Sequence, residues 1–322
     1  MKNHLGIVRL LLIIAISAGC VTGCKGYAHA AQTTQIAAES MVQVSKDTEA
    51  NSIRTVEGIS ENGTQTAENT SESEAEIEES KSPETGKARL NDLKKKLKKE
   101  LKGKAGQWSV YVKNLDTNEY MLINNKKLPS ASLIKLYVMM AAYEEAEGGE
   151  AIKENSSFKS LMKKMITVSD NESANALTGR LTGKGTFKAG IKKINKYCKA
   201  EGYTKTKFLV EMGKSSPRNT TSAKDCGWAL ERMYRGTAVS SESSKKMIRL
   251  LKSQTRRTKI PAGVPKKVKV ANKTGETSFA ENDAAIVYSE GADYVIVVMS
   301  KNGQGAVKEI RKLSKMVYKY FN

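Results

Sequence analysis

The spacing of apolar residues predicts a helix at each end of the region that runs from residue 87 to the C-terminus. Before Gly103, leucines recur at intervals of three and four residues, at Leu90, Leu93, Leu97 and Leu101. Near the end of the chain the same spacing is followed by Val307, Ile310, Leu313, Val317 and Phe321. Residues three and four apart lie on one side of a helix, so each pattern predicts an amphipathic helix whose apolar side faces a core.

Short apolar runs predict five strands near these two helices, at 108–115, 120–123, 268–273, 284–289 and 294–300. The first two flank a turn at Asp116-Thr117-Asn118, and the last three are joined by short connections, as in an antiparallel meander. Because strands are predicted near both ends, we expect one antiparallel sheet that is built from both termini.

A helical block lies between the two groups of strands. In residues 133–143, ten of the eleven side chains are apolar, which predicts a helix that is buried all round. Residues 150–205 are predicted to be helical, with breaks at Gly179, Gly183, Gly185 and Gly202. Two more helices are expected at 221–234 and 241–251, the first opened by Thr220-Thr221-Ser222. The predicted fold class is therefore α/β, of the α+β kind, with an all-α lobe inserted into the antiparallel sheet.

The first 86 residues differ in composition from the rest. Lys2 and Arg9 precede an apolar run at 10–18, which is too short for the about 20 residues that span a bilayer. Residues 1–24 are predicted to be a signal peptide. Val21-Thr22-Gly23-Cys24 resembles a lipobox with Cys24 as the lipidated residue, and Ala28-His29-Ala30 is an alternative cleavage site. Residues 25–86 are predicted to be a disordered linker, so we expect an exported protein, either anchored through Cys24 or secreted and associated with the cell wall.

Charge separates the linker from the domain at 87–322. Residues 31–86 hold twelve acidic and three basic residues, a net charge of −9, whereas the whole chain has +20. Because residues 1–30 contribute a net charge of +3, the domain at 87–322 has a net charge of +26. Such a domain attracts anionic partners, and we expect a wall polymer or a membrane surface, unless the lysines merely coat helix surfaces. The lysines are not interleaved with aromatic residues, so a nucleic-acid partner is not expected. The protein is expected to be a monomer.

Histidine and cysteine usage excludes several kinds of site. The two histidines, His4 and His29, lie before or within the linker region, and Cys198 and Cys226 lack the spacing of metal ligands. No metal and no cofactor are expected, and histidine-dependent serine or cysteine mechanisms are excluded for the domain. Cys198 and Cys226 form either one disulfide or two buried thiols.

Ser132 and Lys135 stand at the entrance of the buried helix. At a spacing of three residues they share one side of a helix, which puts the amine within reach of the hydroxyl. Burial lowers the pKa of a lysine, so Lys135 can act as the base that deprotonates Ser132. The same spacing occurs at Ser156/Lys159, Ser160/Lys163 and Ser243/Lys246, but these copies lie in polar, amphipathic surroundings.

Two further motifs follow in order, Ser169-Asp170-Asn171 and Lys273-Thr274-Gly275, the second at the end of a predicted strand. With Ser-x-x-Lys they make the chain resemble the class A β-lactamase and penicillin-recognising serine hydrolase family across about residues 90–322. The resemblance extends to segments 218–222 and 282–287. It implies a three-layer α/β/α sandwich with an all-α lobe and the site between the two lobes.

The resemblance also implies roles for the motif residues. Ser132 is implied to attack a β-lactam or D-alanyl-type amide, with Lys135 as the base and Ser169 as the carrier of the proton to the leaving nitrogen. Asn171 is implied to hold the substrate's side-chain amide, and Lys273 and Thr274 its carboxylate. The backbone N–H groups of Ser132 and Glu276 are implied to form the oxyanion hole. Asp170 and Gly275 are interpreted as structural residues.

The chain departs from the family in the loop under the site and at Glu276. The loop lacks the family's Glu-Pro-Glu-Leu-Asn run, and Glu211 is the remaining acidic residue that could be the base for releasing the acyl group. Glu276 brings a negative side chain close to the oxyanion site. Three hypotheses remain: a β-lactamase, a cell-wall D,D-peptidase or acyl transferase with the same chemistry, and a catalytically idle lipoprotein that binds the wall.

Overall fold

The computed structural model describes residues 83–322, apart from residue 184 and residues 215–217. The predicted signal peptide, Cys24 and the linker up to residue 82 lie outside the described residues. Among the helices of the described part, none is both long and apolar enough to cross a membrane.

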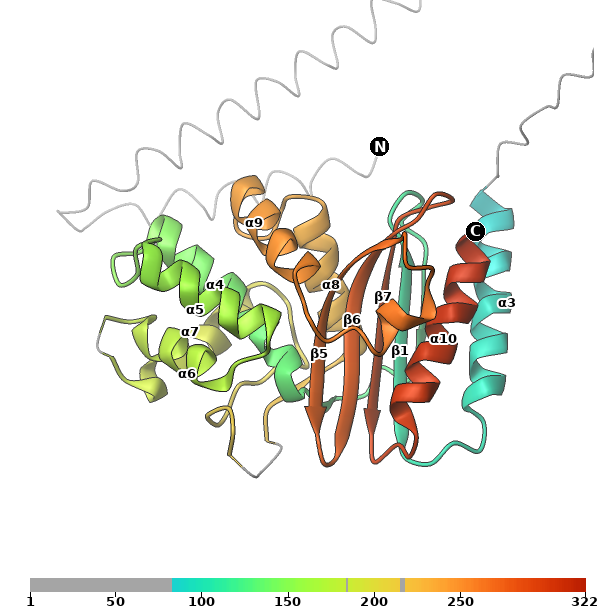
Figure 1. Cartoon of the computed structure of the whole chain (residues 1–322), viewed down its shortest axis with the longest axis horizontal. Coiled ribbons are helices and arrows are strands. Elements are labelled where there is room, and N and C mark those ends of the chain that lie inside the picture. The colour runs from blue at the N-terminus through green and yellow to red at the C-terminus, as the bar shows by residue number, and fades with distance from the viewer. Residues whose placement is uncertain (1–82, 184, 215–217) are drawn as a thin grey trace, which may run out of the picture. The chain divides into compact units, whose positions relative to one another are not determined.

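A five-stranded antiparallel sheet forms the centre of the domain (Figure 1). Its order is β2-β1-β7-β6-β5, with bounds β1 Gln107–Asn114, β2 Tyr120–Ile123, β5 Lys269–Thr277, β6 Ala280–Tyr288 and β7 Tyr294–Lys301. β1 pairs with β7 along its whole length, from Gln107 opposite Lys301 to Asn114 opposite Tyr294. The prediction of one sheet built from both termini is thus confirmed.

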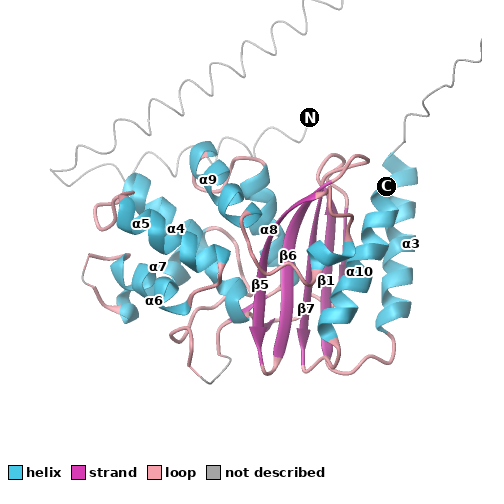
Figure 2. Cartoon of the chain, viewed as in Figure 1, coloured by secondary structure: helices cyan, strands magenta, loops and turns pink. Residues whose placement is uncertain are grey.

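Helices cover both faces of the sheet, as Figure 2 shows. α3, Pro83–Leu101, and α10, Ala306–Phe321, pack on one face, and α8, Ala223–Tyr234, and α9, Ser241–Lys252, lie on the other side. Alternation along β1 separates two cores, because Val110 and Val112 face α3 and α10 while Tyr111 faces α8. This confirms the predicted three-layer α/β/α sandwich.

The predicted all-α lobe is also confirmed. It consists of a 3-10 turn η1, Ala131–Ile134, followed by α4 Lys135–Gly148, α5 Ser156–Thr167, α6 Asn171–Arg180 and α7 Phe187–Ala200. α4 is buried along most of its length, as its apolar sequence predicts. The side chains of Asn155, Asp170 and Thr186 cap the N-termini of α5, α6 and α7 by accepting backbone N–H bonds. Two short strands, β3 Leu128–Pro129 and β4 Thr220–Thr221, pair beside η1, and a second 3-10 turn, η2, spans Ile260–Gly263.

Three local predictions differ from the structure. Lys273-Thr274-Gly275 lies inside β5, because pairing with β6 continues as far as Thr277 opposite Ala280. Gly179 does not break the helix, since α6 extends to Arg180. Thr221 belongs to β4, and α8 begins two residues later, after the capping residue Ser222.

Cys198 and Cys226 are free thiols in the structure, and both are buried. Burial raises the pKa of each thiol to about 12, so both are protonated at neutral pH. Of the two alternatives left open by the sequence, the structure has the pair of buried thiols.

Leu97 tests the core under α3, because its side chain is fully buried against the sheet. We expect Leu97→Ala to lower the free energy of unfolding by about 2–5 kcal/mol through lost burial and a cavity. Lys99→Ala, on the exposed side of the same helix, should change it by less than about 0.5 kcal/mol. Urea titration followed by circular dichroism measures both, and equal effects of the two substitutions would contradict this packing.

Candidate active site

Ser132 lies in the 3-10 turn that leads directly into α4, and Lys135 is the first residue of α4. The turn brings the Lys135 Nζ atom to 3.2 Å from the Ser132 Oγ atom. Ser132 is partly buried, whereas Lys135 is fully buried. The hydroxyl that the Ser-x-x-Lys spacing singled out is therefore in contact with an amine in the interior.

Ser169 connects this pair to the sheet. It has a left-handed backbone, with φ of 63°, between α5 and α6. Its Oγ atom accepts a hydrogen bond from Lys273 Nζ at 2.8 Å and lies 3.3 Å from Lys135 Nζ, and its carbonyl accepts a hydrogen bond from Lys135 at 2.5 Å. One residue thus bridges the two lysine amines with two oxygen atoms.

Burial controls the charge of both amines. It lowers the pKa of Lys135 to about 7, against a smaller opposing effect of the Asp170 charge. The pKa of Lys273 also lies well below its usual range, first because the side chain is buried and then because Lys135 is near. A large fraction of Lys135 is therefore neutral at physiological pH.

The contacts of Lys135 fit a neutral amine with two N–H groups and one lone pair. Two short hydrogen bonds go to oxygens that can only accept, the Ser169 carbonyl at 2.5 Å and Asn171 Oδ1 at 2.7 Å. These bonds use both N–H groups. The lone pair is then left for the Ser132 hydroxyl, which is the arrangement that a general base requires.

Asp170 and Asn171 are held at the start of α6. The Asp170 carboxylate accepts the Ser173 N–H at 2.7 Å as the helix cap, and its hydrogen bonds with Ser173 hold its pKa below the ordinary value. This agrees with the structural interpretation of Asp170. The Asn171 side chain is exposed beyond Lys135, with its Nδ2 atom near Gly213.

Gly275 allows β5 to run against the turn that carries the serine. A Cβ atom at Gly275 would lie 2.8 Å from the Ser130 carbonyl oxygen and 3.2 Å from the Ser132 backbone nitrogen. This close approach places the backbone that leads into Glu276 alongside the N–H of Ser132. The interpretation of Gly275 as room for close approach agrees with this geometry.

Asn282, on β6, also holds the turn that contains Ser132, through hydrogen bonds to the backbone just before it. Its Nδ2 group donates to the carbonyls of Pro129 and Ser130 at 3.0 and 3.2 Å, and its Oδ1 atom accepts the Ser300 N–H. Asn282 is fully buried. In the sequence it stands out only as the first residue of segment 282–287, to which the family resemblance extends, and no local pattern links it to Ser130.

The Glu276 carboxylate is neutralised by two cations that the motifs did not indicate. Arg256 contacts it at 2.6 Å, and Lys259, which is fully buried, contacts it at 2.8 Å and also pairs with Glu281 at 2.7 Å. Although partial burial raises it, these contacts hold the pKa of Glu276 below its ordinary value. The expected negative charge beside the oxyanion site is therefore largely compensated. Only the cluster of basic residues at 256–259 could have indicated this.

Glu211 is placed apart from the other predicted residues. Its side chain is 44% exposed and lies 3.7 Å from the Lys214 amine. Asn175 fixes the loop through two hydrogen bonds with the Met212 backbone. Among the described residues, no hydrogen bond joins Glu211 to Ser132, Lys135 or Ser169.

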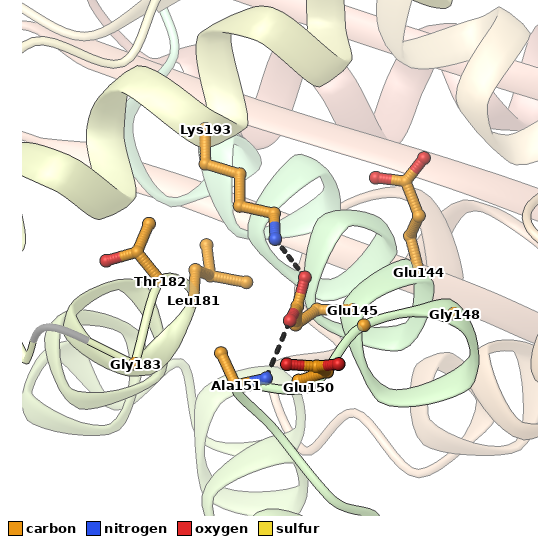
Figure 3. Close-up of a pocket in the computed structure, with 10 residues that line it drawn as sticks. Glu144, Glu145, Gly148, Glu150, Ala151, Leu181, Thr182, Gly183 and Lys193 are labelled. Carbon is orange, nitrogen blue, oxygen red and sulfur yellow. Dashed lines mark hydrogen bonds and ion pairs between the residues drawn. The ribbon is translucent and has the colours of Figure 1, made fainter. Parts of the chain in front are cut away.

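A separate hollow of about 820 Å³ lies around the C-terminus of α4 (Figure 3). Glu145 accepts hydrogen bonds there from Lys193 and from the Ala151 backbone, and Glu144 and Glu150 line its edge. None of the motif residues lines it. In the described part of the chain, no group of three or more histidine, cysteine or acidic residues could hold a metal ion.

Comparison with known proteins identifies one family. The model of the beta-lactamase enzyme family matches residues 92–156 and 151–321. The solved structure of PBP-A is 24% identical, with a TM-score of 0.65, over 72% of this chain and 96% of that chain. The TLA-1 extended-spectrum β-lactamase is 19% identical, with a TM-score of 0.64, over 72% and 98%. A β-lactamase from Sphaerobacter thermophilus is 17% identical, with a TM-score of 0.62, over 72% and 97%. At these identities the solved structures show a shared fold.

The buried amine of Lys135 should leave a signature in the pH dependence of stability. Its pKa is about 7 in the folded protein and returns to about 10.4 on unfolding. Between these values the unfolded state binds more protons, so Lys135 makes the free energy of unfolding rise with pH. We expect the stability of the native chain relative to Lys135→Met to increase from pH 7 to pH 10.

Urea titrations at several pH values measure this difference, and Lys192→Met, at an exposed position on α7, is the control. The control should show a nearly constant difference from the native chain. A constant difference for Lys135→Met as well would show that the amine keeps its ordinary pKa.

Proposed function

The chain belongs to the beta-lactamase enzyme family, and on this premise we propose that it is an active-site-serine hydrolase of the class A type. It opens the cyclic amide of a β-lactam through an acyl-enzyme on Ser132. The observation that carries the proposal is the 3.2 Å contact between Ser132 Oγ and the Lys135 amine, whose pKa is lowered to about 7. Together these supply a nucleophile and its base without histidine.

Acylation follows from this geometry. The Ser132 hydroxyl gives its proton to the Lys135 lone pair as Oγ bonds to the carbonyl carbon. The negative charge on the carbonyl oxygen is stabilised by the backbone N–H groups of Ser132 and Glu276, each typically worth about 3 kcal/mol. The C–N bond then breaks, and the leaving nitrogen takes a proton through the Ser169 hydroxyl, which contacts both lysine amines.

Substrate binding uses the residues on either side of Ser132. Lys273 and Thr274 bind the substrate carboxylate, whose negative charge favours the protonated form of the buried Lys273 amine. Asn171 binds the amide of the substrate side chain, since its side chain is exposed at the start of α6. Water then hydrolyses the ester, releases the acid and restores the Ser132 hydroxyl.

Export is part of the proposal. The apolar run at 10–18 and the lipobox-like segment 21–24 support a signal peptide followed by anchoring through Cys24 or release to the cell wall. The acidic linker that precedes α3, which begins at Pro83 and not at the predicted residue 87, then separates the domain from its anchor. β-Lactams and D-alanyl peptides, the two candidate substrates, are met on that side of the membrane.

A second function, that of a D,D-peptidase or acyl transferase, is favoured by the position of Glu211. Without a carboxylate in contact with Ser132, water is not activated and the acyl-enzyme persists. Residue 184 and residues 215–217, which the structure does not describe, contain no acidic residue. One of the solved structures of similar fold is a mutant of PBP-A in an acyl-enzyme complex with penicillin G. A third function, that of an idle wall-binding protein, requires no reaction at Ser132.

Covalent labelling tests the proposed function directly. We expect the full chain to gain the mass of penicillin G on Ser132, and Ser132→Ala to gain none, because the ester needs this hydroxyl. Intact-mass spectrometry over time measures the adduct, and peptide mapping locates it. Ser156→Ala, in a Ser-x-x-Lys copy on the surface, is the matched control and should label normally. If the native chain formed no adduct and released no hydrolysed penicillin, the serine hydrolase would be overturned and the idle binding protein would remain.

The lifetime of the adduct tests Glu211. Because this side chain is exposed and contacts Lys214, we expect Glu211→Gln to change the deacylation rate by less than about twofold. The rate is measured by the return of the unmodified mass after free penicillin is removed. Glu150→Gln, an exposed carboxylate away from Ser132, is the control. A decrease of a hundredfold or more for Glu211→Gln alone would contradict this expectation and make Glu211 the base that releases the acyl group.

A further inference from the structure

The outer surfaces of α3 and α10 are strongly basic. The two helices lie side by side on one face of the sheet (Figure 1). With the turn after α3 they expose twelve cations, Arg89, Lys95, Lys96, Lys98, Lys99, Lys102, Lys104, Lys308, Arg311, Lys312, Lys315 and Lys319. Among their described side chains the exposed carboxylate is Asp92. We call this surface the α3–α10 basic face.

Most of this charge is not compensated within the described residues. Three of the cations make ion pairs, Lys95 with Asp92, Lys104 with Glu309 and Glu100, and Lys312 with Glu100. The other nine make none in the part of the chain that the structure describes. Lysine side chains that merely solubilise a helix are commonly interspersed with acidic residues, so an excess of this size indicates an anionic partner.

The basic face is also hollowed. A hollow of about 570 Å³ at the end of α3 has an apolar floor that includes Trp108 and a rim of Lys98, Lys99, Lys102, Lys104 and Lys126, without an acidic residue. A second, of about 440 Å³, lies between the two helices, where Arg89, Lys96 and Lys319 surround Tyr320 together with one carboxylate, that of Asp92. These hollows accept parts of a ligand below the level of the cationic rims.

Three classes of anionic partner make different demands on such a surface. A bilayer is bound most firmly when apolar side chains insert, and among the described side chains none of the large exposed apolar ones lies on α3 or α10. Single-stranded nucleic acid needs exposed aromatic platforms for its bases, and the aromatic rings that line the two hollows are recessed, since Trp108 is buried and Tyr320 is half-buried. A hydrated, flexible polyanion needs only spaced cations and recesses.

We propose that the α3–α10 basic face binds a linear polymer that carries phosphodiester groups along a polyol backbone. Ten of the twelve cations are lysines, whose ammonium groups pair with phosphate as point charges and do not need the planar geometry of a carboxylate pair. The chain of the polymer follows the surface of the helices, and its backbone enters the hollows.

Binding at this face leaves the serine accessible. The α3–α10 basic face lies on the core that contains Leu97 and Ile310, whereas the turn that carries Ser132 packs into the other core, through Leu133 and Ile134. The polymer therefore holds the domain in place while Ser132 remains open to its substrate. The proposal does not depend on the reaction at Ser132.

The test uses the full chain and synthetic poly(glycerol phosphate) carrying a fluorophore at one end, with binding measured by fluorescence anisotropy at several salt concentrations. The variant is Lys98→Gln/Lys99→Gln/Lys102→Gln, on the rim of the hollow at the end of α3. The matched control is Lys192→Gln/Lys196→Gln/Lys199→Gln, three exposed lysines of α7, which removes the same charge from another surface.

We expect the α3 variant to bind the polymer at least about tenfold more weakly. The slope of log Kd against log salt concentration should also fall by about 2, because each of the three lost phosphate contacts contributes about 0.7 to it. The α7 control should stay within about twofold of the native chain. Equal weakening by both triple variants would overturn the proposal, since only total charge would matter. Tighter binding to anionic vesicles or to single-stranded DNA, lost in the α3 variant alone, would also overturn it in favour of that partner. Ser132→Ala should bind as the native chain does, so failure of the serine hydrolase leaves this result unaffected.

Discussion

The structure depends on keeping two lysine amines buried around one serine hydroxyl. Removing an ammonium group from water is costly, and two in one place repel each other as well, so both groups lose proton affinity. The protein compensates with oxygen acceptors, the Ser169 carbonyl and Asn171 Oδ1 for Lys135, and the Thr274 carbonyl for Lys273. The left-handed backbone of Ser169 lets one residue present both a carbonyl and a hydroxyl to these amines. The lowered pKa values of the two lysines therefore come from the desolvation of their amines and not from the residue types alone.

Two contacts between the sheet and the helical lobe keep this arrangement in register. Gly275 lets β5 touch the turn at Ser130 and Ser132, and Asn282 on β6 holds the carbonyls just before the serine. Because β5 and β6 pair over nine residues, a shift of one strand would move both contacts at once. The sheet thus fixes the position of the serine relative to the proposed oxyanion site. Arg256 and Lys259 complete the edge by neutralising Glu276, which makes an acidic residue tolerable next to a developing negative charge.

The two halves of the proposed reaction are supported unequally. Acylation has its nucleophile, base, proton carrier and carboxylate-binding residues within one hydrogen-bonded cluster. Release of the acyl group has no comparable group among the described residues, since Glu211 faces Lys214 and solvent. A family fold therefore does not by itself fix the fate of the acyl-enzyme, which is decided by one loop. The basic charge is likewise placed by the fold, on helices at the opposite face of the sheet from Ser132.

The sequence by itself determined the elements and the motifs. Leucine spacing located α3, apolar runs located the strands, and Ser132, Lys135, Ser169, Asn171, Lys273 and Thr274 were identified in order, because helix periodicity and motif spacing are local properties. Tertiary structure decided what lies far apart in the chain. Three contacts join different segments of the fold: the hydrogen bond from Lys273 to Ser169, the hydrogen bond from Asn282 to the Ser130 carbonyl, and the ion pair between Lys259 and Glu276. It also decided that Lys273-Thr274-Gly275 lies inside a strand and that Cys198 and Cys226 are separate thiols. Burial, pKa and ion pairing depend on which segments pack together, and no local pattern of side chains specifies that.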